Sequence, residues 1–143
     1  MKRRQFIRTA TTLPLLALAA CEKNLPSTPT VVTGKVTDEN NLPVEGVEFL
    51  FYGTNKKGLS GIPTFDLSAT SDKEGIYRFS QVIPNGTDNA SILPQETNKF
   101  RFGIDYSIFF YKDGIANAAT APIEIERKNY GKENVINFQI RKK

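Results

Sequence analysis

The 143-residue chain contains no histidine, no tryptophan and a single cysteine. Without histidine, neither a serine nor a cysteine hydrolase that relies on an imidazole base can operate. Zinc sites built on histidine or on several cysteines are excluded as well. Because Cys21 is alone, no disulfide forms within the chain. The sequence therefore predicts no catalytic residue, no metal ligand set and no cofactor.

The N-terminus also lacks an apolar run long enough to cross a bilayer. Its apolar stretch, residues 10–20, has 11 residues, whereas a membrane-spanning helix needs about 20. A basic segment, residues 1–8, precedes this stretch, and small residues end it. This order is typical of an export signal. We therefore predict a signal peptide over residues 1–20, with cleavage before Cys21.

An excess of positive charge is absent once the signal peptide is set aside. Four of the 19 basic residues lie in residues 1–20, which leaves 15 basic and 15 acidic residues in the mature chain. The formal charge of +4 thus belongs to the precursor. Because the mature chain has no net positive charge, its charge does not predict a basic surface for nucleic acid. No nucleic acid partner is therefore expected.

What the N-terminus does contain is the run Leu18-Ala19-Ala20-Cys21, directly after the apolar stretch. This run resembles the lipobox of bacterial lipoproteins. The resemblance implies a diacylglycerol group on the Cys21 sulfur and cleavage before that residue. Membrane lipid is then the first expected partner, and the location is the cell envelope, on the periplasmic side or on the outer membrane. A buried cysteine in an amphipathic helix is the alternative, which Pro14 opposes.

The basic segment carries a second resemblance. Arg3, Arg4 and Phe6, followed by an aliphatic and a basic residue, are similar to the twin-arginine export signal, which a receptor reads as an address. That route implies that the domain can fold before it crosses the membrane. A general secretory signal with an ordinary basic start is the alternative.

After the cysteine, the composition changes to that of a tether and one β domain. Residues 21–30 contain two prolines and no periodic pattern, so we predict an extended tether with a reach of roughly 30 Å. Residues 31–143 alternate short β-like runs with turn clusters. The polar segment 84–99 is expected to be a loop. The expected strands are 31–37, 47–52, 65–70, 76–80, 100–112, 118–125 and 134–140, a pattern that predicts a two-sheet all-β sandwich.

Two segments of this region resemble the carboxypeptidase regulatory-like, transthyretin-like domain: residues 33–47 (TGKVTDENNLPVEGV) and residues 70–79 (TSDKEGIYRF). The first segment departs from the family at Asn41, where glycine is usual, but asparagine tolerates the left-handed conformation. The second contains Ser71 as an extra residue. Gly34 leaves room in the packed first strand, and Gly75 permits a tight turn.

This resemblance implies a transthyretin (prealbumin)-like Greek-key sandwich of about seven strands. Such domains serve mainly as non-catalytic modules, attached to enzymes, at the start of outer-membrane transporters or as small envelope lipoproteins. Hydroxyisourate hydrolases and intradiol dioxygenases have similar sandwich folds, but both are expected to need histidine. We therefore expect a membrane-anchored envelope lipoprotein that is not an enzyme, whose sandwich serves as a binding or structural module. The expected partner is an envelope protein or a glycan.

Carboxylates supply the remaining chemical alternatives. Glu124 and Glu126 lie two residues apart, near Glu133 in the sequence, and a hydrolase of the glycosidase type needs two such groups across a cleft. A solvated strand surface is the simpler interpretation. The acidic turns could instead bind calcium through oxygen ligands, and the residues concerned are Asp38, Glu39, Asp72 and Glu74.

Aromatic side chains supply a candidate binding surface. If Phe49 and Phe51 point into the sandwich, their strand neighbours point outward, and the same holds for the strand at 100–112. An exposed patch could then form, unless the 84–99 loop covers it. Such a patch would suit a carbohydrate-binding module, and its expected members are Leu50, Tyr52, Phe109 and Tyr111.

Overall fold

The structure is a computed structural model that describes residues 24–143. The predicted signal peptide lies outside the described residues, and so do all the residues predicted for export and lipidation: Arg3, Arg4, Phe6, Leu18, Ala19, Ala20 and Cys21.

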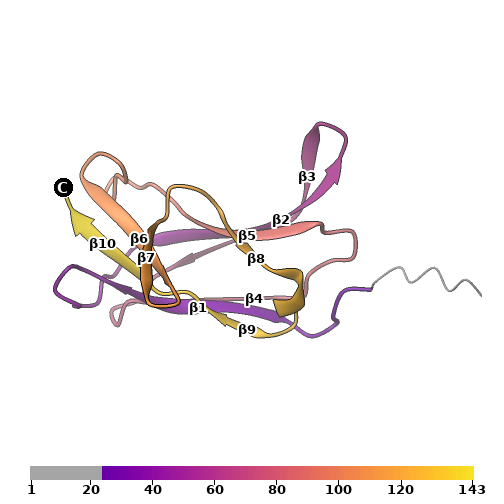
Figure 1. The fold of residues 1–143 in the computed structure, drawn as a ribbon, viewed down its shortest axis with the longest axis horizontal. Coiled ribbons are helices and arrows are strands. Elements are labelled where there is room, and N and C mark those ends of the chain that lie inside the picture. The colour runs from indigo at the N-terminus through magenta and orange to yellow at the C-terminus, as the bar shows by residue number, and fades with distance from the viewer. Residues whose placement is uncertain (1–23) are drawn as a thin grey trace, which may run out of the picture.

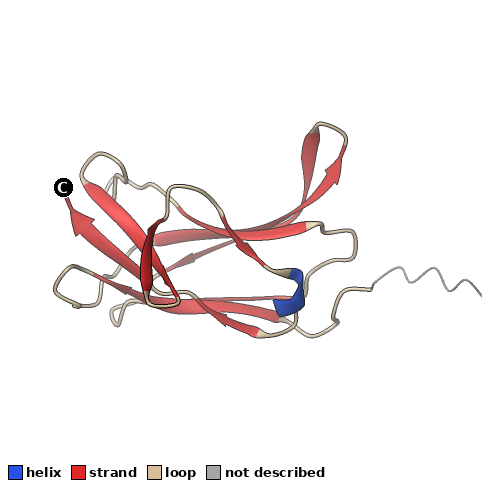
Figure 2. Cartoon of the chain, viewed as in Figure 1, coloured by secondary structure: helices blue, strands red, loops and turns tan. Residues whose placement is uncertain are grey.

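Ten strands and one short 3₁₀ helix follow one another along the described chain (Figures 1 and 2). Their bounds are β1 (Thr30–Thr37), β2 (Glu48–Lys57), β3 (Ser60–Thr70), β4 (Ile76–Gln81), β5 (Asn89–Pro94), β6 (Tyr106–Lys112), β7 (Ile115–Ala118), β8 (Ile123–Ile125), η1 (Arg127–Asn129), β9 (Glu133–Val135) and β10 (Phe138–Lys142).

The strands form two sheets. One has the order β4-β1-β10-β6-β7, with β9 also paired to β1, and the other has the order β3-β2-β5-β8. Most pairs are antiparallel, whereas β1 runs parallel to both β9 and β10. The predicted all-β sandwich is therefore confirmed, with ten strands among the described residues where about seven were expected.

The additional strands come from segments that the sequence pattern assigns otherwise. Residues 84–99 are not a free loop, because β5 lies inside them and pairs with both β2 and β8. The Gly- and Lys-rich segment 53–63 extends β2 and β3 into one long hairpin. The strand expected over 100–112 begins only at Tyr106, and Ile104 lies 63% exposed in the preceding turn.

Aromatic rings from both sheets fill the core. Phe49 of β2 stacks on Tyr77 of β4, with ring centroids 4.4 Å apart, and lies 4.8 Å from Phe138 of β10. Phe51 contacts Phe79 at 5.6 Å. All five side chains are at most 3% exposed. Aromatic pairs in these arrangements stabilise beyond the area that they bury, so these contacts hold the two sheets together.

A close crossing on β1 explains the glycine at position 34. The last part of the chain pairs with β1 first through β9 and then through β10, with a break between them at Ile136. There the Ile136 carbonyl lies over Gly34, where a Cβ atom would come within 1.8 Å of its oxygen. The Tyr77 hydroxyl donates to the same oxygen at 2.6 Å. The expected close packing at Gly34 is confirmed.

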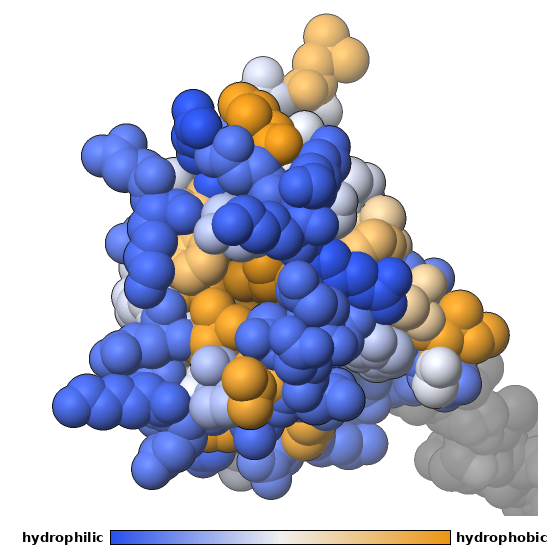
Figure 3. Space-filling model, turned by 90° about the vertical axis from the view of Figure 1, so that its left-hand side faces the viewer, coloured by the Kyte–Doolittle hydropathy of each residue, from blue (hydrophilic) through white to orange (hydrophobic). Residues whose placement is uncertain are grey.

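Two aspartate-capped turns close one end of the sandwich, which we name the turn end. The Asp38 carboxylate accepts from two backbone amides of its turn, at 2.8 and 2.9 Å. The Asp72 carboxylate does the same, at 2.9 and 2.8 Å. Asn41 has φ 61° and Gly75 has φ 76°, so both predicted left-handed positions are confirmed. The surface of this end is mostly hydrophilic around a central apolar area (Figure 3).

The other end of the sandwich is named the N-terminal end, because the described chain enters there (Figure 1). It comprises the segment 25–28, the loop 84–88 and the tip of the β2–β3 hairpin at residues 57–60. In Figure 1 this hairpin projects away from the body of the sandwich. Among residues 24–143, no helix is long and apolar enough to span a membrane.

Candidate functional site

The chain is fixed to the domain earlier than the sequence suggests. The Leu25 amide donates to Asn85 Oδ1 at 3.1 Å, and the Thr28 hydroxyl donates to the Gly131 carbonyl at 3.3 Å. The Leu25 side chain also packs against the core. Residues 25–30, predicted as part of the tether, thus lie against the sandwich, and β1 already begins at Thr30.

This docking shortens the distance that a lipid at Cys21 could keep from the domain. Three residues separate Cys21 from Leu25. Four extended residue steps reach at most about 14 Å, about half of the reach expected for the full tether. A membrane anchor at Cys21 would therefore hold the N-terminal end close to the lipid headgroups.

The loop 84–88 joins the docked segment to the β2–β3 hairpin. Asn85 accepts from Leu25, and the Gly86 carbonyl accepts from the Asn55 side-chain amide of β2. The Lys56 amide donates to the Asp88 carboxylate at 2.6 Å. Leu25, the loop and the β2 arm of the hairpin therefore form one connected surface. A hollow of about 310 Å³ lies in it, lined by Asn24, Leu25, Asn85, Gly86, Thr87, Asp88 and Arg127.

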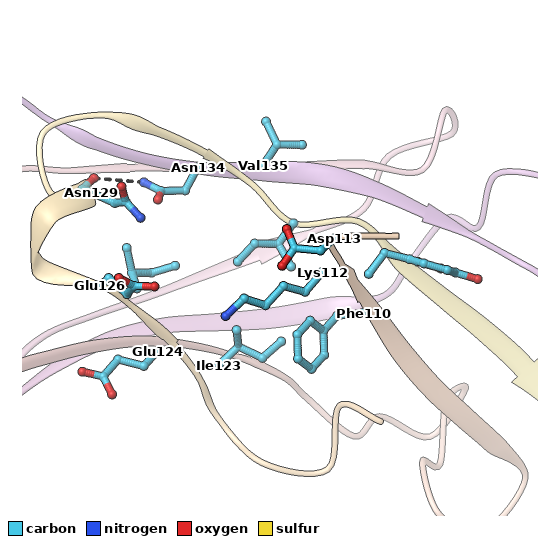
Figure 4. A pocket seen from close by; sticks show the side chains of 12 residues that line it. Phe110, Lys112, Asp113, Ile123, Glu124, Glu126, Asn129, Asn134 and Val135 are labelled. Carbon is cyan, nitrogen blue, oxygen red and sulfur yellow. Dashed lines mark hydrogen bonds between the residues drawn. The ribbon is translucent and has the colours of Figure 1, made fainter. Parts of the chain in front are cut away.

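A second pocket opens at the side of the sandwich (Figure 4). It has a volume of about 310 Å³ and lies where β6 and β8 come from different sheets without pairing. Lys112 extends through it toward the side where Glu126 lies (Figure 4). The lining residues come from β6, β8, η1 and the β9–β10 segment: Phe110, Tyr111, Lys112, Asp113, Ile123, Glu124, Ile125, Glu126, Asn129, Asn134, Val135 and Ile136.

The structure brings together two of the three carboxylates considered for hydrolysis. Glu124 and Glu126 both line the side pocket, whereas Glu133 lies on β9, 3.6 Å from Arg78. The Lys128 ammonium, 2.7 Å from Glu126, lowers the pKa of that carboxyl by hydrogen bonding and by its charge. A general acid needs a raised pKa. The environment of Glu126 therefore opposes the general-acid role in a hydrolase.

The acidic turns are used for backbone capping. One carboxylate oxygen of Asp38 and one of Asp72 already accept two amides each. Among the described residues, 24–143, no group of three or more potential metal ligands of the Asp, Glu, His and Cys types gathers. The calcium alternative finds no site at the turn end.

The predicted aromatic patch is divided between the two sheets. Leu50 and Tyr52 lie on β2 and Phe109 and Tyr111 on β6, so these pairs face outward from opposite layers. Arg141 covers the Phe109 ring at 4.5 Å. The 84–99 segment does not cover the β2 pair, because its strand β5 lies beside β2 in the same sheet. One continuous aromatic surface for a glycan is therefore not formed by these four side chains.

Comparison with known proteins gives no family assignment. No family model matches the chain, and no curated protein matches it. The resemblance to the carboxypeptidase regulatory-like domain thus stays a prediction, while the strand pairing itself establishes the sandwich.

Several solved structures are distantly similar. The major pilin subunit of Bacillus cereus matches 81% of the chain at 16% identity and a TM-score of 0.45, over 31% of its own length. The full-length major pilin of Corynebacterium diphtheriae matches 83% at 12% identity and 0.48, over 32% of its length. A 3-chlorocatechol 1,2-dioxygenase of Rhodococcus opacus matches 84% at 10% identity and 0.40, over 62% of its length. The chain thus spans about a third of each pilin, and similarities at this level transfer no activity and no partner.

Proposed function

We propose that this chain is an exported lipoprotein, held on a membrane of the cell envelope through acylated Cys21, whose sandwich acts as a non-enzymatic binding or structural module. The observation that carries the proposal is the run Leu18-Ala19-Ala20-Cys21 after a short apolar stretch with a basic start. The same segment lacks the length to span a bilayer, so anchoring falls to the acylated cysteine. Export by the twin-arginine route, read from Arg3, Arg4 and Phe6, is part of this proposal.

The arrangement of the domain is consistent with such an anchor. A folded unit begins within four residues of Cys21 and has its own aromatic core. Two acyl chains bind a membrane stably, where a single chain binds only marginally. The anchored product needs no further membrane-binding element to stay attached.

Replacing Cys21 with serine tests the anchor. The Cys21→Ser variant is expected to lose the mass of the lipid and to leave the membrane fraction or to remain as uncleaved precursor. The measurements are intact mass and fractionation of cells that mature lipoproteins. A Cys21→Ser protein that stays membrane-bound with the mass of the normal mature form would contradict the proposal.

Binding of a small polar ligand in the side pocket is a second candidate, which the pocket lining favours. Lys112, Asp113 and Asn129 offer charged and amide groups beside the Phe110 ring, the mixture that is common in ligand sites. Although it faces outward from β6, Tyr111 is among the residues that line the pocket, so its fluorescence should respond to an occupant. Titration with a panel of glycans tests this candidate, and an unchanged tyrosine emission throughout would count against it.

A further inference from the structure

The tip of the β2–β3 hairpin carries the most exposed large apolar side chain among the described residues. Leu59 is 108% exposed, and Ile62 of β3 is 52% exposed. The turn itself is open, since a Cβ atom added to Gly58 would meet no other atom within 4 Å. An apolar side chain held fully in water on a projecting hairpin gains nothing from the fold that carries it.

The part of the hairpin around this tip is positively charged. Residues 54–62 contain Lys56 and Lys57 and no acidic residue. Within residues 24–143, the ion pairs join Arg78 to Glu133, Arg101 to Asp105 and Lys128 to Glu126, so neither lysine of the hairpin takes part. A leucine that closely follows two cations suits the boundary between acyl chains and anionic headgroups.

The location of the hairpin favours the lipid bilayer as its binding partner. Leu25 is hydrogen-bonded to Asn85, and the same loop is hydrogen-bonded to Asn55 and Lys56 in the β2 arm of the hairpin. An acylated Cys21 lies within about 14 Å of Leu25. The hairpin and the anchor thus belong to the same end of the molecule, and the hairpin projects from it (Figure 1).

From these observations we infer that the β2–β3 hairpin is a second membrane contact, which inserts Leu59 into the lipid interface and places Lys56 and Lys57 against anionic headgroups. This inference rests on the proposed lipid anchor. The lipid tethers the chain, while the hairpin fixes the orientation of the sandwich, with the turn end pointing away from the membrane.

The test uses the lipidated full-length product, reconstituted in vesicles of phosphatidylcholine and phosphatidylglycerol with brominated acyl chains. Because the chain has no tryptophan, Leu59→Trp introduces a single indole at the hairpin tip. Leu42→Trp is the matched control, since Leu42 is 59% exposed in the turn that Asp38 caps at the opposite end. Binding to the vesicles should shift the emission maximum of Leu59→Trp to the blue, because the indole leaves water, and bromine on the acyl chains should quench that emission. Neither change is expected for Leu42→Trp.

Charge is tested in the same vesicles. Adding Lys56→Gln and Lys57→Gln to the Leu59→Trp protein should reduce the quenching and remove its dependence on phosphatidylglycerol. Quenching that does not depend on the anionic lipid in either protein would overturn the role of the lysines.

The outcomes separate the hairpin from the anchor. A protein with the acylated mass, bound to vesicles, in which both indoles escape quenching would overturn the hairpin inference and leave the anchor intact. Equal quenching of both indoles would also overturn it, because the domain would then have no fixed orientation. A shift of the Leu59→Trp emission that requires added envelope protein would assign the hairpin to a protein partner instead. A protein without acyl mass in the soluble fraction would overturn both proposals.

Discussion

The two ends of the sandwich differ in how their polar and apolar groups are used. At the turn end, carboxylates and positive-φ residues bind the backbone tightly, as in the turns capped by Asp38 and Asp72. At the N-terminal end, a long hairpin leaves the body of the fold and exposes Leu59. Local bonds at the turn end stabilise the domain, whereas the exposed groups at the N-terminal end are available for contacts outside it. Substitutions at the turn end should therefore cost stability, and those at the hairpin should affect binding.

The largest effect should come from glycine replacement. At Gly75, φ is +76° and a Cβ atom would lie 2.4 Å from the Val36 carbonyl oxygen. We expect Gly75→Ala to lower the free energy of unfolding by about 3–4 kcal/mol through strain and steric overlap. Gly58→Ala is the matched control at the hairpin, where φ is +72° but no atom lies within 4 Å, and should cost about 1 kcal/mol. Equal losses in urea denaturation would contradict the contrast between the ends.

The next effect concerns Ser71, which the sequence pattern marks only as an extra residue. Its hydroxyl accepts from the Val47 amide at 2.9 Å and donates to the Val44 carbonyl at 2.8 Å, and the residue is 2% exposed. Ser71→Ala leaves both backbone groups without this partner and should cost about 2 kcal/mol. Ser60→Ala at the exposed start of β3 should change stability by less than about 0.5 kcal/mol. A Ser71→Ala protein as stable as the Ser60→Ala protein would show that the two hydrogen bonds of the Ser71 hydroxyl do not stabilise the turn end.

The core between the ends should respond to alkali. Burial raises the pKa of Tyr77 above its ordinary value, so the folded state holds that proton more firmly than the unfolded chain. The contribution of Tyr77 to stability is complete below the unfolded pKa of about 10. Above that pH it should fall by about 1.4 kcal/mol per pH unit.

Tyr77→Phe is expected to make this alkaline loss shallower, although it also removes the hydrogen bond to Ile136. The measurement is urea unfolding between about pH 9 and pH 11, a range that brackets the ordinary tyrosine pKa. An alkaline slope identical in the two proteins would show that another group controls the loss. Burial also raises the pKa of Tyr130, so Tyr130→Phe is the second variant to compare.

The smallest effect should come from the docked N-terminal segment. Asn85→Ala removes the acceptor of the Leu25 amide and should cost about 0.5–1 kcal/mol. Amide hydrogen exchange at Leu25 should increase, while exchange in the turn that Asp72 caps stays the same. Unchanged exchange at Leu25 would mean that the packing of its side chain alone holds the segment.

Local patterns in the sequence predict the turn end well. Asn41, Gly75 and the aspartates beside them act through neighbouring backbone, so their conformations follow from their own segments. Gly34 is predicted to leave room, but the carbonyl that needs this room belongs to Ile136, which only the folded chain brings there.

The N-terminal end depends on contacts that no local pattern contains. Leu25 bonds a residue 60 positions away, and its own segment has the composition of a proline-rich tether. The sequence pattern does not reveal β5, because polar residues and prolines surround the short buried pair Ala90 and Ile92. The Gly- and Lys-rich hairpin carries few strand-forming residues, and its pairing across β2 and β3 determines its form.

The most direct test of the account is the intact mass of the mature protein, purified from the membranes of cells that process lipoproteins. We predict a chain that begins at Cys21 and carries diacylglycerol on that residue. A chain that keeps residues 1–20, or that begins at Cys21 without added lipid, would contradict the anchor on which the assignment rests.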